Sequence, residues 1–235
     1  MSLNITNTMN LKSEKSIKEY LKTLPDDTII KYYLDVEFTP FPILVIQEYT
    51  RRFKQKTKGE LVKSAELFAK KKHSGKSTNG STYSKHLEDV VNRLKSFGVD
   101  DEQLCAGWLH DILENTDTSF DDLHGKFGST ITVIVSSLSK DMTIPRKQRN
   151  KEYAKQLKEA SFNAKLIKLC DISANLSDLK NYKASKSKIM RQIRQNRYHL
   201  ILIKNDLIDN PNPKIQILLN NTNEILQKYG QRNTL

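Results

Sequence analysis

Residues 109–116 constrain the fold of this chain most, because they place ionisable side chains directly after an apolar run. His110, Asp111 and Glu114 follow an apolar lead-in (residues 105–108) that is typical of the start of a buried helix. Burying such groups is costly unless a partner compensates them, and a metal ion is the usual partner for adjacent His and Asp. The segment therefore predicts a metal centre whose remaining ligands come from elsewhere in the chain.

Two other segments each carry an ionisable residue in an apolar setting. His86 opens the amphipathic segment 86–97, and Asp171 lies in the middle of the apolar segment 164–176. Taken singly, His86 is more often an ordinary hydrogen-bonded histidine, and Asp171 could pair with Lys168 one turn away. Together with the pair above they offer two imidazoles and two carboxylates, which suit Mn²⁺, Fe²⁺ or Zn²⁺ with water completing the shell.

The remaining pattern is helical. Apolar residues recur at three- and four-residue spacing, no stretch alternates convincingly as a strand does, and only 8 Gly and 6 Pro are available for tight turns. The expected helices cover residues 17–24, 43–53, 59–72, 86–97, 100–115, 116–123, 131–138, 146–157, 164–176, 185–208 and 215–229. On a continuous helix, Glu114 at four residues after His110 would project from the same face toward the metal.

These segments predict an all-α protein with one main domain. We expect an N-terminal helical extension over residues 1–57, with a loosely ordered start, and the main domain over residues 58–208. A C-terminal helix within residues 209–235 is expected to pack on that domain. The composition, 37% hydrophobic and 28% charged, lies within the range of globular proteins.

The composition also limits where in the cell this protein is expected and which kinds of partner it can bind. No apolar run approaches the ~18 residues of a membrane span and no signal-peptide pattern opens the chain, so we expect a cytoplasmic protein without a membrane partner. Cys105 and Cys170 lie in apolar surroundings and are interpreted as reduced core residues. The net charge of +12 fits a field that attracts a phosphorylated nucleotide or nucleic acid, and it equally fits a Lys- and Asn-rich background.

The order of these residues on successive helices resembles the H…HD…D signature of the HD phosphohydrolase superfamily. Within it, the flanking residues are similar to the hydrolase domain of the RelA/SpoT family and its small single-domain relatives, which remove the 3′-pyrophosphate of (p)ppGpp. The similarity covers roughly residues 73–178. The segments that carry it are Gly80–His86 (G-x-P-Y-x-x-H-P), Leu109–Thr116 (L-H-D-x-x-E-D-T), Phe127-Gly128, Ser139–Arg149 (T-x-D-x-x-L-P-x-x-x-R) and Lys168–Leu176 (K-L-A-D-x-x-x-N-L).

The resemblance implies an HD-domain helical bundle with the activity of a guanosine-3′,5′-bis(diphosphate) 3′-pyrophosphohydrolase. The metal ligands it implies, for Mn²⁺ or another divalent transition metal, are His86, His110, Asp111 and Asp171. A metal-activated water would attack a nucleotide pyrophosphate, and Glu114 would orient or deprotonate that water. Tyr83 and Asn175 match residues that contact the nucleotide, which the family identifies as a guanosine nucleotide.

Two departures from the family pattern bear on catalysis and on substrate choice. The family's Glu-Asp pair is Glu114-Asn115 here, and an amide can hold a water but cannot take its proton. Where the family places a base-stacking arginine, this chain has Lys76 and Ser77, and a lysine replaces a stacked guanidinium poorly. Asn115 therefore joins the catalytic candidates, and Lys76 and Ser77 join the substrate-binding candidates.

Two alternatives to the (p)ppGpp hydrolase stay open. One is an HD hydrolase of another phosphorylated nucleotide, which the departures favour. The other is a catalytically weak module that binds nucleotide or nucleic acid through its positive charge. A nucleic-acid partner is disfavoured, because the basic helix with Arg191, Arg194 and Arg197 is better explained as a solvated face. The oligomeric state is left open.

Overall fold

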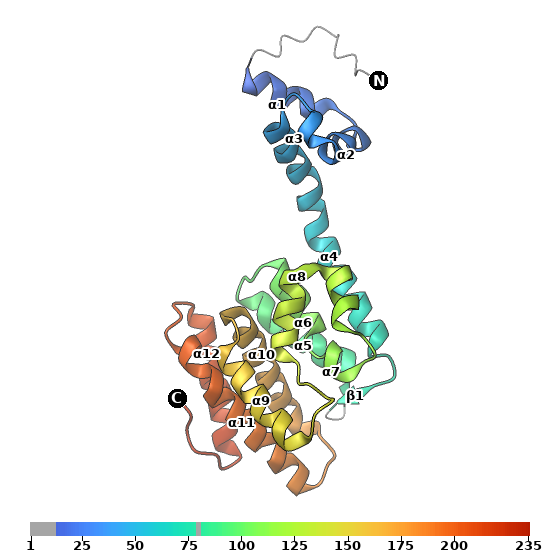
Figure 1. Cartoon of the computed structure of the whole chain (residues 1–235). Helices are drawn as coiled ribbons and strands as arrows, with labels where there is room; N and C mark the ends of the chain where they lie inside the picture. The colour runs from blue at the N-terminus through green and yellow to red at the C-terminus, as the bar shows by residue number, and fades with distance from the viewer. Residues whose placement is uncertain (1–12, 79–80) are drawn as a thin grey trace. The chain divides into compact units, whose positions relative to one another are not determined.

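The computed structural model describes residues 13–78 and 81–235, and its helices confirm the all-α prediction (Figure 1). The chain divides into two compact units, of which the first ends at Glu60 and the second runs from Leu61 to Leu235. The domain limits expected at residues 57 and 208 stay predictions. Over the residues described, no helical stretch combines the length and the apolar character that crossing a membrane requires.

The first unit consists of short helices around a small apolar core. Its elements are α1 (Glu14–Thr23), α2 (Asp26–Leu34), the 3₁₀ helix η1 (Val36–Phe38), α3 (Pro42–Tyr49), the π-helix η2 (Thr50–Lys54) and the first residues of α4 (Gln55–Lys72). Ile17, Leu21, Ile29 and Val45 are its buried apolar residues. The helix expected over residues 43–53 is present, but it continues through the π-helix into α4 without a break.

Arg52 holds this unit together by binding the end of α1. Its guanidinium donates to the carbonyl oxygens of Leu21 and Leu24 at 2.6 Å each, and it pairs with Glu48 at 2.6 Å. The last carbonyl groups of a helix have no partners within the helix, so an arginine that reaches them replaces the missing donors.

The second unit contains the predicted main domain. Its elements after α4 are β1 (Ser77–Thr78), β2 (Ser81–Thr82), α5 (Tyr83–Ser96), α6 (Asp101–Leu109), α7 (Ile112–Asn115), α8 (Phe120–Leu138), α9 (Arg146–Glu159), α10 (Phe162–Asp178), the 3₁₀ helix η3 (Leu179–Asn181), α11 (Lys186–Ile208) and α12 (Pro213–Lys228). The two short strands pair antiparallel, with Ser77 opposite Thr82. Helix α10 contacts α5, α6, α8, α11 and α12, so it is the central helix of the unit.

The helix expected through the central motif is interrupted. Helix α6 ends at Leu109, Asp111 has φ −106° and ψ 2°, and α7 begins at Ile112. The continuous helix expected over residues 100–115 is therefore wrong, whereas the expectation that Glu114 points toward the metal stays a prediction. Without a continuous helix between His110 and Glu114, a separation of four residues no longer aligns their side chains.

Helix α8 joins two of the expected helices across a backbone break at Gly128. The β-branched segment 131–138 is helical as predicted, because Ile131 and Val135 bury one helix face in the core. Gly128 itself has φ 80° and ψ 173°, a conformation that is essentially restricted to glycine.

We expect Gly128→Ala to lower the free energy of unfolding by about 1–3 kcal/mol, because a Cβ is strained in this conformation. Gly125→Ala on the same helix is the matched control, since Gly125 is exposed and its added Cβ meets nothing within 4 Å. The control should raise the free energy of unfolding by roughly 0.5–1 kcal/mol. Urea unfolding measures both, and equal effects of the two substitutions would contradict the strain at Gly128.

Candidate metal centre and its pocket

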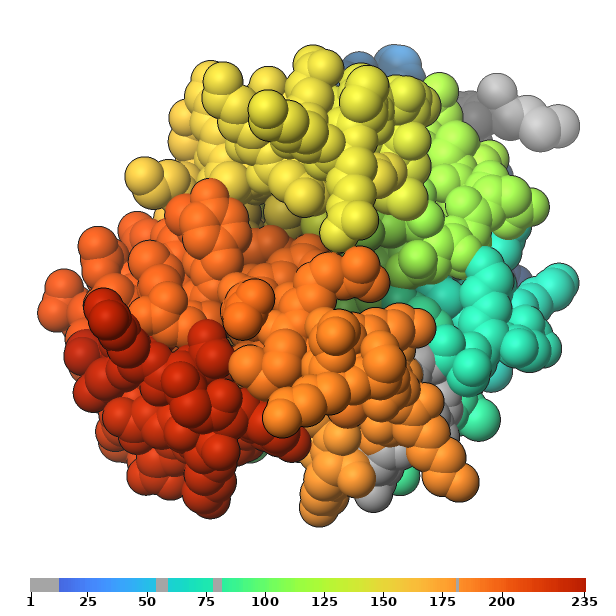
Figure 2. Space-filling view, turned by 90° about the horizontal axis from the view of Figure 1, so that it is seen from below, coloured from blue at the N-terminus to red at the C-terminus, as the bar shows by residue number. Residues whose placement is uncertain are grey.

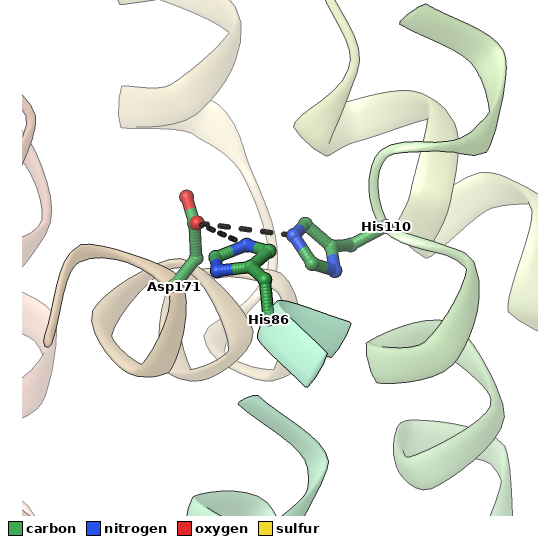
Figure 3. Close-up of side chains that lie close together, drawn as sticks. All are labelled: His86, His110 and Asp171. Atoms are coloured by element: carbon green, nitrogen blue, oxygen red, sulfur yellow. Dashed lines mark ion pairs between the residues drawn. The ribbon is translucent and has the colours of Figure 1, made fainter. Parts of the chain in front are cut away.

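Three of the predicted ligands converge from three helices of the second unit. His86 on α5, His110 after α6 and Asp171 on α10 are buried, and each offers a ligand atom within 4.8 Å of the other two (Figure 3). Asp171 Oδ1 lies 3.3 Å from His86 Nε2 and 3.8 Å from His110 Nε2. They meet because α5 and α6 both pack against the central helix α10.

The tautomer of His110 fits a metal ligand. Its Nδ1 lies 2.8 Å from the carbonyl oxygen of Gly107, so Nδ1 carries the hydrogen and donates it. Its Nε2 then holds a lone pair, and this buried atom has no hydrogen-bond partner in the described part of the chain. Metal-binding histidines usually donate their other ring N–H in this way. An orphaned lone pair beside a second imidazole and a carboxylate suits a divalent cation.

Asp111, the fourth predicted ligand, lies beside this group and is oriented by Tyr83. Its Oδ2 is 3.4 Å from His110 Nε2, and it accepts a hydrogen bond from the Tyr83 hydroxyl. Asn115 Nδ2 donates to the same tyrosine oxygen at 2.6 Å. Because the amide nitrogen can only donate, the tyrosine proton is directed to Asp111. Tyr83, expected to line the nucleotide pocket, thus positions a candidate metal ligand.

The two oxygens of Asp171 have separate partners. Lys168 Nζ binds Oδ2 at 2.7 Å, whereas Oδ1 faces the two histidines and accepts from Asn175 Nδ2 at 2.6 Å. The pairing with Lys168 considered from the sequence is therefore present, and it leaves Oδ1 directed at the imidazoles. Burial alone would raise the pKa of Asp171, but Lys168 and the histidines hold that pKa well below its usual range.

Glu114 is separate from the three converging ligands. Its Oε1 accepts the backbone N–H of Lys140 at 2.8 Å, and Lys140 Nζ lies 3.2 Å from both carboxylate oxygens. The break between α6 and α7 explains this direction, since Glu114 follows the turn instead of extending α6. Glu114 and Asn115 both line a pocket next to the candidate metal ligands.

The loop candidates do not reach this pocket. Lys76 is exposed and donates to the backbone oxygen of Asn115, and Ser77 is exposed on β1. Neither is among the described residues that line the pocket, whereas the third predicted substrate contact, Asn175, is.

His73 is a site residue that the sequence interpretation missed, because it was included in a basic run. It is buried and its ring stacks on Tyr83, with ring centroids 4.4 Å apart and an interplanar angle of 9°. Burial lowers the pKa of His73, so the neutral ring is favoured. The signal was available in the spacing, since His73 continues the buried positions Ala65 and Ala69 at intervals of four residues.

The pocket has a volume of about 310 Å³ and lies between the candidate ligands and α11. In Figure 2 the surface is hollowed where the yellow segment around α9 faces the orange segment of α11. Lys140, Lys168, Lys188 and Arg191 bring positive charge to its lining. The arginines of α11 were expected on a solvated face; Arg191 is exposed, but it also lines this pocket.

Comparisons with known proteins point to one family. Residues 65–198 match the family described as HD domain. The chain is 36% identical over 117 residues to "Guanosine-3′,5′-bis(diphosphate) 3′-pyrophosphohydrolase MESH1" of Danio rerio, a match that covers 48% of the chain and 65% of that protein. For the protein of the same name from Mus musculus, the identity is 34% over 125 residues, covering 51% of the chain and 69% of the relative.

A solved structure shares the fold. It is described as a metazoan ortholog of SpoT that hydrolyzes ppGpp, and it superimposes with a TM-score of 0.62 at 23% sequence identity. The match covers 72% of this chain and 96% of the other.

We expect Tyr83→Phe to weaken binding of a divalent transition metal roughly tenfold or more, because Asp111 loses the donor that orients it. Calorimetric titration of the metal-free protein with Mn²⁺ measures this affinity. Tyr198→Phe is the control, since Tyr198 is 49% exposed on α11 and should leave the affinity unchanged. An unchanged affinity in Tyr83→Phe would show that the hydroxyl does not position a ligand.

Proposed function

The chain belongs to the HD domain family, and from this membership we propose that it is a metal-dependent phosphohydrolase acting on guanosine-3′,5′-bis(diphosphate). The observation that carries the proposal is the buried meeting of His86, His110 and Asp171 beside a cation-lined pocket. The similarity to the zebrafish and mouse relatives, which are named for this activity, supports the same substrate and the release of its 3′-pyrophosphate.

We propose that His86, His110, Asp111 and Asp171 hold the metal, with Mn²⁺ as the ion. A bound divalent cation supplies Lewis acidity, which activates a water and offsets charge on phosphoryl oxygens. Two of these residues already have hydrogen-bond partners that orient them: Gly107 orients His110, and Tyr83 orients Asp111. Such partners fix the direction of the ligand atoms before the ion binds.

Glu114 is the residue that we propose accepts the proton of the attacking water. Lys140 holds its carboxylate at the pocket through the backbone N–H and the ammonium group, so one oxygen has a fixed direction. Asn115 cannot take that proton, and its amide instead donates to Tyr83. Lys188 and Arg191 are exposed at the pocket and supply charge for the phosphates of the substrate.

One observation favours a second candidate substrate within the same reaction class. The ammonium group of Lys76, which stands where the family stacks an arginine on the base, is bound to the backbone of Asn115. A lysine held in this way offers no planar surface to a guanine, so another phosphorylated nucleotide is the alternative. A metal-supplemented panel of phosphorylated nucleotides, with released phosphate and pyrophosphate as readouts, distinguishes the two.

The Mn²⁺-loaded protein should release pyrophosphate from ppGpp. His110→Ala should abolish both metal binding and pyrophosphate release, because the site loses the unpaired Nε2 atom of His110. His124→Ala is the control, since His124 is exposed on α8 and should behave like the unmodified chain. Metal content and pyrophosphate release are the measurements. If the purified protein binds no transition metal under any loading condition, the metal-dependent function is excluded.

We expect Glu114→Gln to lower kcat by roughly 10²–10⁴-fold while metal affinity stays unchanged, because the amide keeps the shape of the side chain but cannot accept a proton. Steady-state hydrolysis and calorimetric titration with Mn²⁺ separate the two effects. A loss of metal affinity together with kcat would instead place Glu114 among the ligands, against its separation from them in the structure.

A further inference from the structure

One face of α11 forms a wall of the pocket that changes in character along the helix. Lys188, Arg191, Gln195 and His199 line the pocket at spacings of three and four residues, which places them on one helix face, and Asn196 beside Gln195 lines it as well. The face spans about 16 Å at the rise of an α-helix. Lys188 and Arg191 are exposed, whereas Asn196 and His199 are buried. The α11 wall of the pocket thus has a cationic outer part and a buried end with uncharged polar side chains.

Asn196 brings an unsatisfied donor to the buried end. The residue is 6% exposed, and its Nδ2 has no hydrogen-bond partner among the residues that the structure describes. A buried amide without a partner destabilises the folded protein, and an apolar side chain at this position would avoid that loss. The amide is therefore available for an acceptor atom that enters the pocket.

His199 lies one helical turn further along and offers a second donor. It is 6% exposed, and its ring packs edge-on against Tyr153 with centroids 5.3 Å apart. Burial, then Lys168 and Lys140, lower the pKa of His199 to about 3, so the ring is neutral at physiological pH. A neutral imidazole carries one N–H donor and one acceptor. The charged groups facing it are Lys140, Lys168 and Asp171.

Two ammonium groups lie at the same end. Lys140 Nζ and Lys168 Nζ are 4.5 Å and 5.7 Å from the centroid of the Tyr153 ring against which His199 packs. Each is paired with one carboxylate, Glu114 or Asp171. An ammonium group has three N–H donors, so an ion pair does not exhaust its capacity.

We propose that Asn196 and His199, together with Lys140, form an oxyanion subsite at the buried end of the pocket, which binds a phosphoryl group of the substrate or the pyrophosphate product. A neutral amide donor without an acceptor, beside an imidazole and two ammonium groups, favours an acceptor oxygen that carries negative charge. The existence of the subsite is argued from the side-chain arrangement alone. The identity of the oxyanion rests on the proposed phosphohydrolase function. Asn196 and His199 lie outside the H…HD…D residues. Since they would contact the substrate without holding the metal, this subsite would help to select among phosphorylated substrates.

Inorganic pyrophosphate is the probe, titrated into the metal-free protein of residues 1–235. We expect Asn196→Leu to weaken pyrophosphate binding roughly tenfold, because a hydrogen bond to a charged oxygen is lost. The same substitution should raise the melting temperature of the ligand-free protein by roughly 2–4 °C, since the unpaired amide is removed. A purely structural asparagine would show the opposite change in melting temperature.

Asn223→Leu is the matched control. Asn223 is also 6% exposed, but its Oδ1 accepts from Thr234 N at 2.9 Å, so its amide group already has a partner within the protein. It should lower the melting temperature and leave pyrophosphate affinity unchanged. His199→Phe keeps the ring packing on Tyr153 and should weaken pyrophosphate binding without loss of folding.

The outcomes separate the subsite from the proposed function. Pyrophosphate binding that depends on Asn196, in a protein that does not hydrolyse ppGpp, supports the subsite and removes the proposed substrate. Hydrolysis of ppGpp with pyrophosphate affinity unchanged in both Asn196→Leu and His199→Phe overturns the subsite and leaves the function in place. Absence of pyrophosphate binding by the unmodified protein also overturns it.

Discussion

The burial of Asp171 in the middle of the central helix is the constraint on which the second unit depends. A carboxylate inside a helix that contacts five others must be compensated, and here Lys168, Asn175 and two histidines surround it. These partners come from α5, from the end of α6 and from α10 itself. Helix packing therefore also compensates the buried charge, which explains why His86, His110 and Asp171 meet in the core.

The turn between α6 and α7 separates two chemical roles that are adjacent in the sequence. His110 stays with the metal ligands because its Nδ1 is bound to the carbonyl group of Gly107. Glu114, after the turn, is held by Lys140 and faces the pocket. One short motif thus supplies both a candidate metal ligand and the residue proposed as the proton acceptor. A continuous helix would have directed both side chains to the same place.

The direction of hydrogen bonds gives Asn115 a physical role. A tyrosine hydroxyl has a single proton, and the amide of Asn115 ensures that this proton goes to Asp111. A carboxylate at position 115 would compete with Asp111 for it. The departure from the family's Glu-Asp pair is therefore part of the hydrogen bonding around a candidate metal ligand, and it leaves an amide where a carboxylate could accept a proton.

The sequence by itself determined the helical class, the family and three converging candidate ligands, because each rests on local spacing or on a buried charge that must find a partner. The helix from residue 131 was predictable for the same reason, since its buried face repeats at helical spacing. Only the tertiary structure decided the direction of Glu114, the stacking of His73 on Tyr83 and the wall formed by Asn196 and His199. These depend on contacts between residues far apart in the chain, and a pattern of three- and four-residue spacing shows that a face is buried without showing what it is buried against.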